Sequence, residues 1–131
     1  MVEDGKTVHE WIREYVPLVN AEFGLSDKNE WGIRYFENMI KYSDYIIDDK
    51  HYVWVVCSKD MWEVPFMSVL SSYIKPEYRT VGMFRKMQEE IIMLAKSKKI
   101  KYILQGSHLN DKLHKVLGMM GYKTSSMRRD I

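Results

Sequence analysis

The sequence predicts an α/β protein of the α+β type, in which helices flank a mixed, mostly antiparallel sheet. Apolar residues recur at helical spacing up to residue 42 and again after residue 80, while β-branched and aromatic runs fill the segment between them. The expected order is helix, helix, three strands, helix, strand, helix and strand, in one domain of residues 1–131. No repeat or Pro/Gly/Ser-rich linker divides the chain.

Two amphipathic helices are predicted before the first strand. Thr7 and Glu10 form a capping box at the start of the first helix. Its apolar stripe consists of Val8, Trp11, Ile12, Tyr15 and Val16. This helix is expected to weaken around Pro17, because the residue before a proline avoids the helical region. A second helix is predicted from Asp27 to Tyr42, with an N-cap at Ser26–Asp27.

Strands and turns alternate in the middle of the chain. Turns are expected at 48–50 and 58–60, and a third extended run covers 64–74 with Pro65 near its start. After Pro76 the spacing predicts a long helix, then a buried strand at 100–105 and a helix at 110–121. Residues 122–131 are expected to form a last strand or a tail.

Composition narrows the class of protein. Of the residues, 46% are apolar and 29% charged, as in ordinary globular proteins, and the net charge of +2 is too small for a dedicated nucleic-acid binder. Cys57 is the only cysteine, which excludes an internal disulfide and favours a reducing compartment. The histidines lack metal-ligand spacing, so no metal site is expected. Without an N-terminal signal or a long apolar run, we expect a cytoplasmic protein.

A candidate phosphate-binding loop lies between residues 74 and 87. A strand ends there, Pro76 and Arg79 follow, and Gly82 stands at the start of the long helix. Backbone N–H groups at such a helix start converge on one point, where the helix dipole also favours an anion. Gly82 would permit close backbone approach, and Arg79 and Arg85 would neutralise phosphate charge.

The same residues carry a family resemblance. Ile74, Pro76 and Arg79 match a strand that ends in Val-x-Pro-x-x-Arg, and Arg79 with Gly82 matches most of Arg-x-x-Gly-x-Gly/Ala. Downstream, the matched positions are Asn110, Leu113, Leu117, Gly121 and Tyr122. With these motifs in register over residues 72–122, the chain resembles the GNAT (Gcn5-related N-acetyltransferase) superfamily. It is also similar to the compact, motif-eroded members that some bacteriophages encode.

The resemblance implies an acyl-CoA-dependent N-acyltransferase that moves an acetyl group from acetyl-CoA to an amine. It implies that the pantetheine arm pairs with the backbone beside the strand and that the pyrophosphate lies on the loop. The implied cofactor-binding residues are Ser72, Tyr73, Ile74, Arg79, Thr80, Val81, Gly82, Met83, Phe84, Arg85 and Asn110. The amine acceptor is not identified.

Two positions depart from the family pattern. Phe84 stands where a small residue is usual, and Leu117 replaces the tyrosine that commonly protonates the leaving thiolate. The catalytic residues are therefore left open, with Tyr73 and Ser72 as the candidate acids and Ser71 as a third.

These departures support an alternative function. A catalytically inactive scaffold of the same fold could act as a protein-interaction or phage-assembly subunit, as a homo-oligomer or in a virion. The sequence also lacks the strand with which the family usually begins. A small nucleic-acid-binding domain is the third hypothesis, and the low net charge of the chain disfavours it.

Overall fold

The computed structural model describes residues 5–105 and 128–131. Its helices are α1 (Val8–Glu22), α2 (Asn29–Met39) and α3 (Val81–Ser97), with 3₁₀ turns η1 (Ser26–Lys28), η2 (Ile40–Tyr42) and η3 (Pro76–Tyr78). Its strands are β1 (Asp44–Ile47), β2 (His51–Lys59), β3 (Pro65–Ile74), β4 (Tyr102–Gln105) and β5 (Arg128–Asp130). The helix expected at 110–121 lies outside the described residues.

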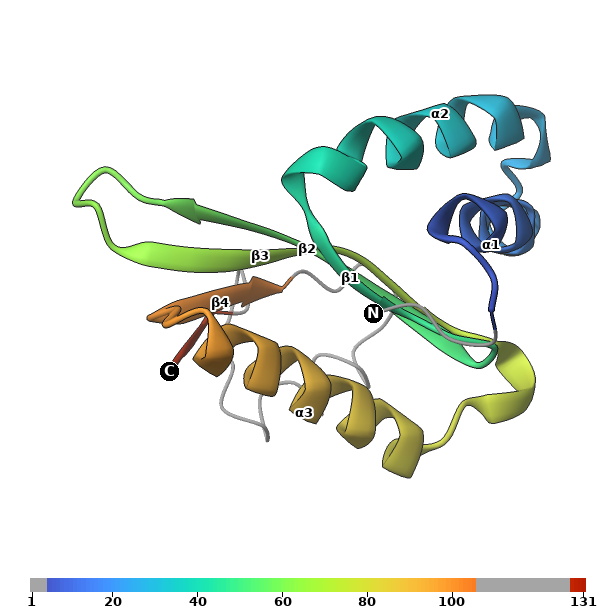
Figure 1. The fold of residues 1–131 in the computed structure, drawn as a ribbon. Helices are drawn as coiled ribbons and strands as arrows, with labels where there is room; N and C mark the ends of the chain where they lie inside the picture. The colour runs from blue at the N-terminus through green and yellow to red at the C-terminus, as the bar shows by residue number, and fades with distance from the viewer. Residues whose placement is uncertain (1–4, 106–127) are drawn as a thin grey trace.

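The strands form one sheet in the order β1-β2-β3-β4-β5. Every neighbouring pair is antiparallel except β3 and β4, which run parallel. Helices α1 and α2 cover one face of the sheet and α3 covers the other (Figure 1). The predicted fold class, a mixed and mostly antiparallel sheet flanked by helices, is confirmed.

Each face of the sheet has its own apolar core. On the α3 side, Val53, Val55 and Met67 from the strands pack with Met87 and Ile91 from the helix. On the other side the core is largely aromatic, and its buried members are Trp11, Ile12, Tyr15, Val16, Ile47, Tyr52, Trp54 and Tyr73. The strand side chains alternate between these two cores, which fixes the register of the sheet.

The first helix starts as predicted but ends later than expected. Thr7 caps it, since Thr7 Oγ1 accepts a hydrogen bond from the N–H of Glu10 at 3.2 Å. The expected weakening at Pro17 is wrong, because α1 continues through Pro17 to Glu22. A proline inside a helix costs about 3 kcal/mol. The fully buried residues of the preceding two turns hold α1 against the sheet and outweigh that cost.

The second predicted helix is helical but interrupted. Residues 26–42 divide into η1, α2 and η2, and neither the start of η1 nor that of α2 has a side-chain cap, so the predicted N-cap at Ser26–Asp27 is wrong. Instead α2 is placed by its contact with α1. A Cβ on Gly32 would lie 2.8 Å from Val16 Cγ1, so only glycine permits this approach of the two helices.

The hairpin between β2 and β3 is longer than predicted. The prediction of a turn at 58–60 is wrong at its start: the turn begins two residues later, because Ser58 and Lys59 still pair with Phe66 and Pro65. The turn begins at Asp60, whose Oδ1 accepts from the N–H groups of Trp62 and Val64 at 2.9 and 3.0 Å. The hairpin extends away from the helices (Figure 1).

The two glycines in the described helices, Gly32 and Gly82, predict opposite effects of alanine on stability. Gly32→Ala should lower the free energy of unfolding by about 1 kcal/mol or more, because overpacking outweighs the gain in helix propensity. Gly82→Ala is the matched control. Its Cβ would meet only Thr80 Oγ1, at an ordinary 3.8 Å, so up to about 1 kcal/mol of stabilisation is expected. Urea unfolding of both variants checks this, and a Gly32→Ala protein as stable as Gly82→Ala would contradict it.

Candidate active site at the split between two strands

The central strand β3 is paired along only part of one edge. Residues 66–69 pair with β4, whereas on the other edge β2 follows β3 from Pro65 to Ile74. Among the described residues, no strand continues beside residues 70–74 on the β4 side. The carbonyl of Ile74 accepts a hydrogen bond from Arg79 Nε. The other backbone groups on this edge have no strand partner among the described residues, and such groups can pair with an extended ligand. Ser72, Tyr73 and Ile74, the predicted pantetheine-binding residues, lie in this stretch.

A β-bulge marks the point where the split begins. Trp54 pairs with Ser71 while Val55 pairs with Val69, which leaves Leu70 as an extra residue in β3. A bulge bends its strand and re-aims the side chains that follow. The sequence carried no signal for it, because Leu70 continues an apolar strand pattern.

The start of α3 presents backbone donors next to the same strand end. Thr80 caps the helix, with Oγ1 accepting from the N–H of Met83 at 3.0 Å. Among the described residues, the N–H groups of Val81 and Gly82 have no hydrogen-bond partner, as expected for the first turn of a helix. Space beside Gly82 is open, since its Cα could carry a Cβ without a clash. This is the geometry that binds an anion.

Arg79 is engaged with the first helix. Its Nη1 and Nη2 donate to the two carboxylate oxygens of Glu22 at 2.6 and 2.7 Å, and its Nε donates to the carbonyl of Ile74 at 2.8 Å. The hydrogen bonds from Arg79 lower the pKa of Glu22, and those to Glu22 raise the pKa of Arg79. The binding of phosphate by Arg79 therefore stays a prediction. Arg85 is exposed on the first turns of α3.

The two candidate acids lie on opposite faces of β3. Tyr73 is buried on the α1 side, where its hydroxyl donates to Glu22 at 2.8 Å, and burial raises its pKa to about 12. Ser72 is exposed, and strand alternation places it on the α3 side together with Ile74. Tyr73 and Ser72 therefore do not meet in one site.

A third hydroxyl, that of Ser71, lies where the bulge meets a cavity between α1, α2 and the sheet. Ser71 Oγ is 2.7 Å from Tyr52 Oη, and burial raises the pKa of Tyr52 to about 12. Sequence reasoning missed Tyr52, because an aromatic residue in an apolar strand is typical of a core. Strand pairing sets Tyr52 opposite Tyr73, within reach of Ser71.

The Phe84 ring is accommodated inside the fold. It packs, partly buried, against the core on the α3 side. Two buried amides lie on α3 and β4: both polar atoms of the Gln88 side chain and Oε1 of Gln105 lack a hydrogen-bond partner among the described residues. An unsatisfied buried amide is costly, and both side chains are almost fully buried, at 0% and 4% exposed.

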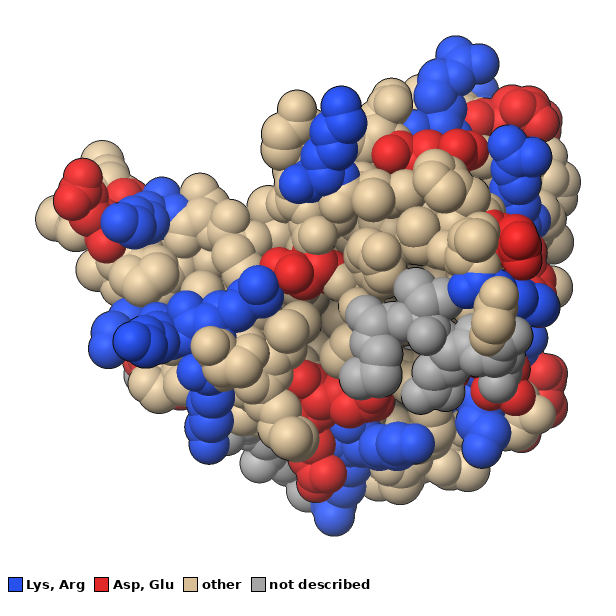
Figure 2. All heavy atoms as spheres, viewed as in Figure 1, with Lys and Arg blue, Asp and Glu red and all other residues tan. Residues whose placement is uncertain are grey.

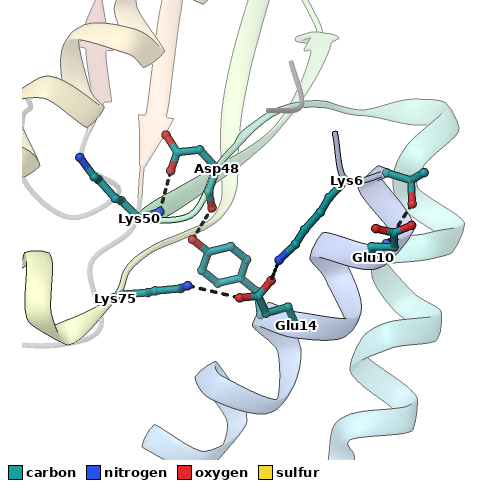
Figure 3. Close-up of polar contacts among 8 residues, drawn as sticks. Lys6, Glu10, Glu14, Asp48, Lys50 and Lys75 are labelled. Atoms are coloured by element: carbon teal, nitrogen blue, oxygen red, sulfur yellow. Dashed lines mark hydrogen bonds and ion pairs between the residues drawn. The ribbon is translucent and has the colours of Figure 1, made fainter. Parts of the chain in front are cut away.

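Helix α1 also anchors the segment that joins β3 to α3. Glu14 accepts from Lys6 at 2.7 Å and from Lys75 at 3.3 Å (Figure 3), and these contacts, with Lys6 contributing most, lower its pKa. Tyr15 donates from its hydroxyl to the carbonyl of Asp48 at 2.6 Å. The loop before α3 is thus fixed to α1 at two charged residues, Lys75 and Arg79.

Other kinds of site find little support in residues 5–105 and 128–131. No group of three His, Cys, Asp or Glu side chains in this part of the chain could hold a metal ion, and none of its helices is long and apolar enough to cross a membrane. His51 is buried between Asp48 and Glu90, at 3.0 and 2.8 Å, and joins the β1–β2 turn to α3. Positive and negative side chains are interspersed on the face shown in Figure 2.

The fold is that of solved acetyltransferase structures. The chain is 16% identical to a candidate acetyltransferase from Pyrococcus furiosus, with a TM-score of 0.74 over 94% of this chain and 92% of that one. A second structure, a probable acetyltransferase, is 15% identical and also has a TM-score of 0.74, over 92% and 88% of the two chains. A predicted acetyltransferase from Clostridium acetobutylicum, solved with acetyl-CoA, is 13% identical with a TM-score of 0.67 over 88% and 84%. No protein-family description and no curated protein matches the sequence.

The Glu22–Arg79 pair predicts a pH-dependent contribution to stability. Because the pKa of Glu22 is lowered from its ordinary value of 4.5, the carboxylate stabilises the fold above that pH and the contribution is lost as the pH falls through the lowered pKa. Glu22→Gln should destabilise by roughly 0.5–1 kcal/mol at pH 7 and by less at pH 3. Urea midpoints at both pH values measure this. Glu89→Gln on the exposed face of α3 is the control, and a pH-independent effect of Glu22→Gln would argue against the ion pair.

Proposed function

We propose that the protein is an acetyl-CoA-dependent N-acetyltransferase that acts on a primary amine. One observation carries the proposal: among the described residues, the edge of β3 that has no strand partner ends next to the N–H groups without a partner at the start of α3. The edge of β3 can pair with an extended ligand arm, and the N–H groups at the start of α3 can bind an anionic group joined to that arm. The fold shared with a structure solved with acetyl-CoA supports this choice.

The described residues suit the cofactor. Ser72, Tyr73 and Ile74 would hold the pantetheine arm through their backbone, and the segment from Thr80 to Arg85 would hold the pyrophosphate. Asn110, the last predicted cofactor residue, lies outside the described residues. When bound, acetyl-CoA supplies the activated acetyl group.

The chain's own chemistry centres on Ser71. Its hydroxyl lies on the part of β3 that β4 leaves unpaired, and it also lines the cavity on the α1 side. With a pKa of about 12, Tyr52 keeps its proton at neutral pH and can donate it to Ser71 Oγ. Ser71 can in turn donate its own proton to a leaving thiolate. This pair would replace the acid that is missing at Leu117.

The scaffold alternative loses one of its supports. Phe84 was the departure closest to the phosphate-binding loop, and its ring packs into the core beneath α3. No observation on the described residues specifically favours an inactive scaffold. The enzyme is therefore the function that we carry forward.

Substitution of Gly82 tests cofactor binding directly. Isothermal titration with acetyl-CoA should show saturable binding by the unchanged protein and none by Gly82→Val, whose branched side chain would occupy the space beside the helix N–H groups. The urea midpoint of this variant should stay close to that of the unchanged protein, because no neighbouring atom obstructs a Cβ there. Absence of binding to the unchanged protein at millimolar acetyl-CoA would overturn the proposal.

Substitution of the serines tests the proton donor. With an amine that the protein acetylates, Ser71→Ala and Tyr52→Phe should each lower kcat by about a hundredfold and leave the KM for acetyl-CoA nearly unchanged. Thiol release from acetyl-CoA measures both constants. Ser72→Ala, one residue along on the opposite face, is the matched control. Equal rates for Ser71→Ala and Ser72→Ala would exclude Ser71 as the donor.

A further inference from the structure

The cavity between α1, α2 and the sheet has a volume of about 510 Å³, within the range of small-molecule sites. Leu70 and Ser71, at the β3 bulge, form part of its wall. This inference rests on the proposed function: an acceptor bound in this cavity would place its amine beside Ser71. The other residues that line the cavity then indicate the chemical class of the group that carries the amine.

The wall is aromatic and almost free of charge. Six of its side chains carry rings: Tyr15, Trp31, Tyr35, Phe36, Tyr52 and Trp54. Of the described residues that line the cavity, Lys28 is the only charged one, and none is a carboxylate. An acceptor with several ammonium groups would lose its hydration without gaining an anionic partner. A flat apolar body would instead meet ring faces and edges.

Two of these rings are held at the cavity although water reaches them. Trp31 is 67% exposed, and it stacks on Tyr35 with ring centroids 5.5 Å apart and an interplanar angle of 12°. Leaving a tryptophan exposed forgoes the free energy of burying its apolar surface. A ligand that enters the cavity would cover this surface, since both residues line it.

The same wall favours the reactive form of the acceptor. Only a neutral amine has the lone pair that attacks an acyl group, and an apolar cavity disfavours the ammonium form. The charge of Lys28 acts in the same direction. We propose that this cavity binds a primary amine carried on a flat apolar body, such as an arylalkylamine, and that it rejects polyamines.

Phenethylamine is the probe, and no cofactor is added. Titration calorimetry should give saturable binding with a Kd of about 1 mM or tighter, and spermidine should give none. Trp31→Ala should weaken phenethylamine binding about tenfold. Trp62→Ala is the matched control: the same substitution at a 76% exposed tryptophan on the hairpin tip should leave the Kd unchanged. Circular dichroism checks that both variants are folded.

Several outcomes would overturn the inference: no phenethylamine binding, saturable spermidine binding, or equal Kd values for Trp31→Ala and the unchanged protein. Lys28→Glu supplies the wall with a carboxylate, so this variant should bind spermidine measurably. If Lys28→Glu does not bind spermidine either, the charge of the wall does not exclude polyamines, and this part of the inference is overturned.

Failure of this inference can be told apart from failure of the proposed function, because the two titrations use different ligands. Phenethylamine binding without acetyl-CoA binding would retain the ligand class and overturn the acetyltransferase. Acetyl-CoA binding without phenethylamine binding would retain the cofactor site and overturn the ligand class.

Discussion

The partial pairing of β3 is the constraint on which the candidate site depends. Hydrogen bonds to β2 hold the strand rigid along its length, while β4 bonds only to residues 66–69. Residues 71–74 are therefore held extended by β2, while no described strand pairs with them on the other edge.

Helix α1 keeps that geometry in place from the opposite face. It contributes Glu14 to Lys75 and Glu22 to Arg79, and both basic residues belong to the short connection between β3 and α3. Individually these pairs are worth little, because water reaches them. Together they fix the direction in which α3 begins, and with it the direction of its free N–H groups. Arg79 thus has a structural role in addition to its predicted role as a phosphate ligand.

The bulge at Leu70 joins two environments. Along the strand edge on the β4 side, residues 70–74 have no described strand partner. On the sheet face covered by α1 and α2 lies the aromatic cavity. Ser71 follows the bulge directly and belongs to both. A strand without the bulge would alternate regularly, and Ser71 would then exchange faces with its neighbours. The position of one extra residue therefore decides which hydroxyl reaches the cavity.

The types of the described elements, the capped start of α1 and the start of α3 at the loop near Gly82 could be predicted from the sequence, because apolar periodicity, caps and turn residues act over a few neighbours. The sequence did not determine that α1 continues through Pro17 or that Phe84 belongs to the core. Nor could the contacts of Ser71 with Tyr52 and of Arg79 with Glu22 be predicted from the sequence. Those outcomes depend on contacts between segments far apart in the chain, and only the register of the sheet and the packing of the helices on its two faces decided them.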